Sequence, residues 1–138
     1  MRHVSGVLAL SMLAVVVVAG CATTSALAGR SAPLTPLVVD GERYFKLQWE
    51  AGERAQRPEV HGQILNEFGY PARKVRLLVN SLDATGAVTD QTLVYMPGDL
   101  LPGSRYYFET RVPAPAASYR VVVFQYEWIQ AGGGDSHR

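Results

Sequence analysis

The sequence has one cysteine, three histidines and almost no net charge, and each shortage excludes a class of site. A single cysteine cannot form a disulfide within the chain, so packing must hold the fold together. No histidine pair or cysteine cluster has the spacing of a zinc site. Lys and Arg total 13 against 12 Asp and Glu, which gives no basic surface for nucleic acid. We therefore expect no metal or other cofactor and no nucleic-acid partner.

A long hydrophobic run is also missing. Residues 7–19 are apolar except for Ser11, but about 13 residues are too few to span a bilayer as a helix, which needs about 20. Arg2 and His3 give this run a short basic start, and the combination is typical of an export signal. The sequence predicts a signal peptide over residues 1–20.

The cysteine follows this run directly. Val18, Ala19 and Gly20 precede Cys21, and this order of aliphatic, small, small and Cys resembles the lipobox of bacterial lipoproteins. The resemblance implies that a signal peptidase recognises these three residues and cleaves before Cys21. The thiol of Cys21 would carry a diacylglyceryl group and its new amine an acyl chain such as palmitate, enough to hold a protein firmly at a membrane. Because Ala22 is not Asp, the resemblance implies the outer membrane, facing the periplasm, in a cell with two membranes.

Two alternatives for Cys21 stay open. Residues 26–28 (Ala-Leu-Ala) have the form of an ordinary signal-peptidase site, and cleavage there would remove Cys21 and release a soluble protein. An unpaired cysteine in an exported protein can also form a disulfide with another chain. The lipobox adjoins the apolar run and the second site lies farther from it, so we favour lipid attachment.

Composition divides the rest of the chain into three parts. Residues 21–36 are small, polar and interrupted by proline, which is typical of a flexible tether. Residues 131–138 are rich in glycine and predict a disordered tail. Residues 37–130 alternate apolar and polar side chains between short turns, without a sustained helical period. We expect this part to be all-β, an immunoglobulin-like two-sheet sandwich of seven strands, with a small closed barrel as the alternative.

The alternation also assigns faces to the expected strands. The side chains expected to point inward are Phe45, Leu47, Trp49, Val60, Gly62, Ile64, Val75, Leu77, Val79, Tyr106, Phe108, Thr110, Val112, Val122, Phe124, Tyr126 and Trp128. The charged residues 50–59 predict a loop between the first two strands.

Three motifs stand in the order in which they occur in a family of bacterial envelope domains. They are the strand Val60-x-Gly62-x-Ile64-x-Asn66, the hairpin Asp83-Ala84-Thr85-Gly86-Ala87-Val88, and the corner Leu101-Pro102-Gly103 followed by Phe108. Together they resemble the FxLYD-type immunoglobulin-like domains over residues 60–126. Residues 79–83 stand where the family's naming motif would be and share only its Asp. The resemblance implies a fold and an extracytoplasmic setting, and it supplies no catalytic residue.

Few residues suggest chemistry. His61 is the one histidine between residues 37 and 130, and it alternates away from the apolar face of its strand, so we expect a solvated side chain. Asp83 and Asp90 flank a hairpin, where Asp usually accepts hydrogen bonds from its own turn. With no nucleophile beside a base, we expect no catalytic residues and no enzyme.

The outward faces offer three candidate partner contacts. Tyr107 points outward and combines an apolar ring with a polar tip. Val121 and Val123 lie opposite the expected core face of the last strand, so they either form a partner site or are covered by a segment such as residues 36–40. An exposed edge strand could also accept a strand from a partner.

These expectations describe a lipid-anchored envelope protein whose β-sandwich is a protein-interaction module. Its partners would be the membrane, through the covalent lipid, and an envelope protein. One alternative is a passive structural envelope lipoprotein without a discrete ligand. A hydrolase or carbohydrate-acting protein is a weaker alternative because the catalytic groups are missing.

Overall fold

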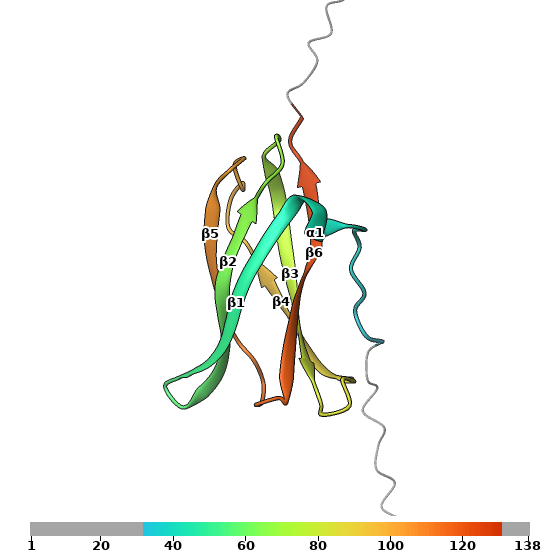
Figure 1. Cartoon of the computed structure of the whole chain (residues 1–138), viewed down its shortest axis with the longest axis vertical. Coiled ribbons are helices and arrows are strands. Elements are labelled where there is room, and N and C mark those ends of the chain that lie inside the picture. Colours follow the sequence, from blue (N-terminus) through green and yellow to red (C-terminus); the bar gives the residue numbers. More distant parts are fainter. Residues whose placement is uncertain (1–31, 131–138) are drawn as a thin grey trace, which may run out of the picture. The chain divides into compact units, whose positions relative to one another are not determined.

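The computed structural model describes residues 32–130, which form six strands and one short helix (Figure 1). The elements are α1 (Gly41–Tyr44), β1 (Phe45–Arg54), β2 (Arg57–Asn66), β3 (Ala72–Leu82), β4 (Val88–Tyr95), β5 (Arg105–Arg111) and β6 (Ser118–Trp128). The expected number of seven strands is thus wrong for this part of the chain. No helix within it is long and apolar enough to cross a membrane. The predicted signal peptide and C-terminal tail lie outside the described residues.

The strands form two antiparallel three-stranded sheets, ordered β1-β2-β5 and β4-β3-β6. The sheets are the two layers of the domain in Figure 1. This confirms the all-β sandwich, and the alternative of a single closed barrel is wrong. The same pairing joins strands A, B and E, and strands C′, C and F, of immunoglobulin-like domains.

The core lies between the sheets and follows the predicted alternation on β2, β3 and β5. Its fully buried side chains include Val60 and Ile64 on β2 and Leu77 and Val79 on β3. Trp49 is the exception on β1, because 36% of its surface is exposed. The core holds the sheets together without a disulfide, as the single cysteine requires.

A bulge corrects the faces predicted for β6. Arg76 pairs with Gln125 and Leu77 with Val123, so Phe124 has no partner on β3. An extra residue in one strand shifts the alternation beyond it. Tyr126 and Trp128 pack against the core as expected, but before the bulge the inward residues are Val121 and Val123, not Val122. Phe124 is buried at 5% exposure, outside the core cluster.

The charged segment 50–59 is a hairpin and not the predicted loop. Arg54 pairs with Arg57, so only Ala55 and Gln56 form the turn. Both have positive φ, 50° and 60°. Two-residue turns of this kind favour Asn-Gly, because most other residues are strained at positive φ. The sequence therefore gave no turn signal here.

This strain yields a stability prediction. Replacing Ala55 with Asn and Gln56 with Gly should raise the free energy of unfolding by about 1 kcal/mol, because both new residues tolerate positive φ. Urea denaturation of the double variant and of Ala55→Asn alone measures the effect. A double variant no more stable than the native chain would contradict the turn geometry.

Asn66, at the end of β2, binds two loops, the β2–β3 connection and the β4–β5 connection. Its Nδ2 donates to the carbonyl oxygens of Tyr70 and Leu100, both at 2.9 Å, and its Oδ1 accepts from the Phe68 amide at 3.0 Å. Its backbone carbonyl accepts from Gly103 N at 2.7 Å. Asn66 is completely buried, and its bond to the Leu100 carbonyl is shielded from water. Of the three motifs in the resemblance, the first and third are therefore in contact, because Asn66 binds the Leu101–Gly103 corner. The Asp83 hairpin makes no hydrogen bond with Asn66.

The Asp83 hairpin is a self-bonded turn, as predicted. The Asp83 carboxylate accepts from Thr85 N at 2.8 Å and from Ala87 N at 3.0 Å. The hydrogen bond from the Thr85 hydroxyl, followed by these backbone bonds, lowers the pKa of Asp83 below its ordinary value. The Asp90 carboxylate likewise accepts from the backbone amide of Gln91 at 2.6 Å.

The end of the expected tether is attached to the β4-β3-β6 sheet. Leu34 N donates to Gln91 Oε1 at 2.6 Å, and Gln91 Nε2 donates to Leu34 O at 2.9 Å. Gln91 Nε2 also donates to Asn80 Oδ1 at 2.7 Å, and Leu37 N donates to Phe124 O at 2.8 Å. Residues 21–31 of the expected tether lie outside the described residues. From Leu34 onward, the segment is held on the sandwich.

Candidate functional site on the outer face of the β1-β2-β5 sheet

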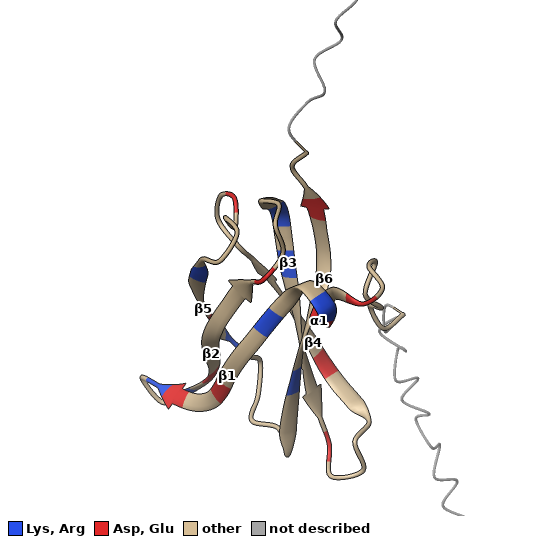
Figure 2. Ribbon diagram, turned by 45° about the horizontal axis from the view of Figure 1, so that its top comes forward, with Lys and Arg blue, Asp and Glu red and all other residues tan. Residues whose placement is uncertain are grey.

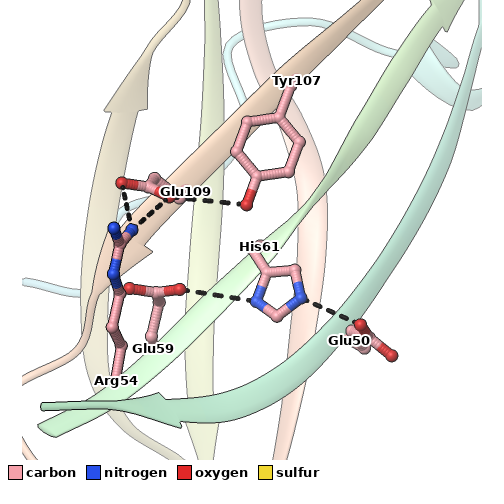
Figure 3. A network of polar contacts seen from close by, with 6 residues as sticks. All are labelled: Glu50, Arg54, Glu59, His61, Tyr107 and Glu109. Atoms are coloured by element: carbon pink, nitrogen blue, oxygen red, sulfur yellow. Dashed lines mark hydrogen bonds and ion pairs between the residues drawn. The ribbon is translucent and has the colours of Figure 1, made fainter.

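Strand register brings a group of polar side chains together on the outer face of the β1-β2-β5 sheet. Glu50 of β1 lies opposite His61 of β2, and His61 lies opposite Glu109 of β5. In a sheet, directly opposite residues share a face and interact. We call the resulting group the His61 network (Figure 3). Its members are Glu50, Arg54, Glu59, His61, Tyr107 and Glu109.

His61 lies between two carboxylates. Its Nε2 is 2.9 Å from Glu50 Oε1, and its Nδ1 is 3.5 Å from Glu59 Oε1. The Nδ1 atom is buried and has no hydrogen-bond partner among residues 32–130, because the contact with Glu59 is too long or poorly aligned. The His61 side chain is 29% exposed and that of Glu59 only 10%. His61 faces outward as predicted, but its side chain is only partly solvated, because the side chains of Glu50, Glu59 and Tyr107 lie beside its ring.

Tyr107 is held in place by a second part of the network. Its hydroxyl donates to Glu109 Oε2 at 3.4 Å, and Arg54 Nη1 lies 3.2 and 3.0 Å from the two Glu109 oxygens. Partial desolvation, and then the negative charges of Glu109 and Glu59, raise the pKa of Tyr107 above its ordinary value. The phenol therefore stays neutral and remains a hydrogen-bond donor.

A shallow hollow of about 560 Å³ lies beside the network. Its lining combines the amides of Gln48 and Gln63, the ring of Tyr107, the imidazole of His61 and the guanidinium of Arg105. Figure 2 shows that both signs of charge are interspersed over the domain. Among the described residues no group of His, Cys, Asp and Glu could hold a metal ion. The arrangement is suited to binding a polar surface through hydrogen bonds and paired charges.

The structure separates the three predicted contact residues. Tyr107 is 56% exposed, as expected of a contact residue. Val121 and Val123 are only 6% and 3% exposed and belong to the core, so the prediction that they contact a partner is wrong. Gly41 fits against Val123, since a Cβ on Gly41 would lie 2.9 Å from Val123 Cβ. The alternative that residues 36–40 cover these valines is confirmed in part, because Val38 of that segment packs against the core that contains them.

The remaining predicted site is the lipid-attachment site. Cys21 and its recognition residues Val18, Ala19 and Gly20 are outside the described residues. Sequence reasoning also missed Glu50, Glu59 and Arg54. The register of the β1–β2 hairpin could have predicted the first of these contacts. A two-residue turn at Ala55 and Gln56 places Glu50 opposite His61.

Comparison with known proteins gives this chain no relative: no family model, no curated protein and no solved structure matches it.

Proposed function

We propose that this chain is a lipid-anchored envelope protein whose β-sandwich binds a partner protein through the outer face of the β1-β2-β5 sheet. The proposal of an anchor rests on the lipobox at residues 18–21. In a cell with two membranes, the domain would sit at the outer membrane and face the periplasm.

The observation that carries the binding proposal is the state of Tyr107. Tyr107 is 56% exposed, and its hydroxyl lies 3.4 Å from Glu109, which in turn binds Arg54 at 3.0 Å. A tyrosine supplies a large contact surface at low conformational-entropy cost, because only two side-chain torsions have to be fixed on binding. The surrounding Gln48, Gln63 and Arg105 supply donors and acceptors for a polar rim.

Site-specific photo-crosslinking in cells tests this face. A photoreactive phenylalanine analogue at Tyr107 should give discrete adducts with another envelope protein. The matched control is Tyr95 of β4, another tyrosine, which is 63% exposed on the other sheet. The same adducts at both positions, or none at Tyr107, would contradict binding through the β1-β2-β5 face.

Metabolic labelling tests the anchor separately. The native chain should incorporate a fatty-acid analogue and fractionate with membranes, whereas Cys21→Ala should lose the label because it has no thiol to acylate. A mature chain that begins beyond residue 21, or a label that persists in Cys21→Ala, would refute lipid attachment at this residue.

A further inference from the structure

Strand β1 is an edge strand with unpaired backbone groups. It pairs with β2 on one side, and among residues 32–130 no other strand pairs with it. On β2, the carbonyl of Pro58 accepts from Val112 N, so it points toward β5 and away from β1. Pro58 lies opposite Glu53. Because antiparallel pairs alternate between bonded and non-bonded, the amide and carbonyl groups of Leu47, Trp49, Ala51 and Glu53 face the free edge.

The free edge is exposed over most of its length. Gln48 to Arg54 are all exposed, in a strand that is otherwise part of the sandwich. Trp49 shares the inward face of the strand with Leu47 but is 36% exposed. An edge with an exposed apolar residue and open hydrogen-bonding groups is a template for another strand.

The sequence of this edge is complementary to itself. Around Gln48, the order is Lys46-Leu47-Gln48-Trp49-Glu50. In an antiparallel pair of two such strands centred on Gln48, each Lys46 lies opposite Glu50 of the second copy. Each Leu47 lies opposite Trp49, and the two Gln48 side chains meet. We propose that two copies of this chain associate through their β1 edges in this register and form one six-stranded sheet.

The register agrees with the direction of the backbone groups. Leu47 and Trp49, whose amides and carbonyls face outward, become the pair that exchanges hydrogen bonds. Lys46 and Glu50 fall in a non-bonded pair, where side chains come closest and opposite charges attract. Both side chains are available, since those of Lys46 and Glu50 are 67% and 77% exposed while contacting Glu67 and His61.

Competing registers are less favourable. A pair centred on Glu50 would place Glu50 opposite its own copy and Lys46 opposite Arg54, so like charges would meet. A pair centred on Trp49 would place Lys46 opposite Gly52 and lose the ion pairs. A pair centred on Gly52 would place Glu50 opposite Arg54, but it would lose the Leu47–Trp49 pair and would use Arg54, which already contacts Glu109. Charge and apolar contact together therefore favour the Gln48-centred register.

Disulfide trapping tests the register. In that register the two Gln48 Cα atoms are about 4.5 Å apart, within the range a disulfide bridges. The experiment uses the full chain carrying Cys21→Ser, so that Gln48→Cys adds the only thiol. Under mild oxidation, Gln48→Cys should form a covalent homodimer at least about tenfold faster than Lys46→Cys, whose copies would be about 13 Å apart along the strand. Equal rates at the two positions, no dimer, or a mixed disulfide with a different protein would overturn the proposal.

Charge reversal supplies an independent readout. In the same chain with Gln48→Cys, Lys46→Glu should reduce dimer trapping because both ion pairs become Glu–Glu pairs. Adding Glu50→Lys should restore trapping, since the pairs are re-formed with reversed sign. Thermal unfolding of each variant verifies the fold. The register would be refuted if Lys46→Glu left the rate of dimer trapping unchanged, or if adding Glu50→Lys failed to restore that rate. Neither arm depends on the anchor or on Tyr107.

Discussion

Replacing Asn66 with aspartate should lower the free energy of unfolding by about 3–5 kcal/mol. The new side chain has the same shape and can still accept from Phe68 N. It cannot donate, so the carbonyls of Tyr70 and Leu100 lose their Nδ2 partner and face a carboxylate. Because Asn66 and its bond to Leu100 are buried, water cannot replace that bond.

Urea denaturation at pH 7 measures this loss, and Asn80→Asp is its matched control. Asn80 is also buried, at 6% exposure, but its side chain accepts from Gln91 and donates no hydrogen bond within the described residues. Asn80→Asp should therefore cost clearly less than Asn66→Asp. At acid pH, the deficit of Asn66→Asp relative to the native chain should shrink, because a protonated carboxyl regains a donor. Similar losses for both variants would show that burial of charge, and not lost donation, dominates.

Replacing Gly62 with alanine should cost about 2–3 kcal/mol, because β1 passes too close to β2 for a side chain there. A Cβ on Gly62 would meet the carbonyl oxygen of Gln48 and lie 2.7 Å from Trp49 Cα. Both are backbone atoms of a paired strand, so neither can move without displacing β1. We expect local separation of β1 from β2 around the Trp49–Gly62 pair.

A second glycine of the same hairpin is the control for Gly62→Ala. A Cβ on Gly52 would meet only His61 Cε1, at 3.6 Å, an ordinary van der Waals distance. Gly52→Ala should therefore leave thermal stability nearly unchanged or raise it slightly, since alanine restricts the unfolded chain more than glycine does. Equal destabilisation by both substitutions would mean that the close approach at Gly62 is not the cause.

Period-two alternation predicted much of the sandwich because its signal is local. On β2, Val60 and Ile64 must point the same way once the strand is extended, and the core then follows. The bulge at Phe124 was not predictable in this way, since it depends on how β6 is matched to β3. The tight turn at Ala55 and Gln56 was missed for a local reason. Both residues adopt a positive φ that alanine and glutamine normally disfavour, so their identities do not indicate a turn.

The candidate site was predicted only in part. Alternation placed His61 and Tyr107 on an outward face, and the structure agrees. It could not bring Glu50 to His61, because that contact depends on the register of a hairpin that carries no turn signal. Composition also could not reveal that His61 is half-buried, since its cover comes from strands on both sides.

The attachment of Leu34 and Leu37 determines how the domain would respond to mechanical load. A pull on the chain from the side of residue 31 reaches the bonds between Leu34 and Gln91 first, and the bond between Leu37 and Phe124 next. Both points of attachment lie on the β4-β3-β6 sheet. The segment that begins at residue 32 can therefore peel away and lengthen the connection under tension before any strand of the sandwich has to separate.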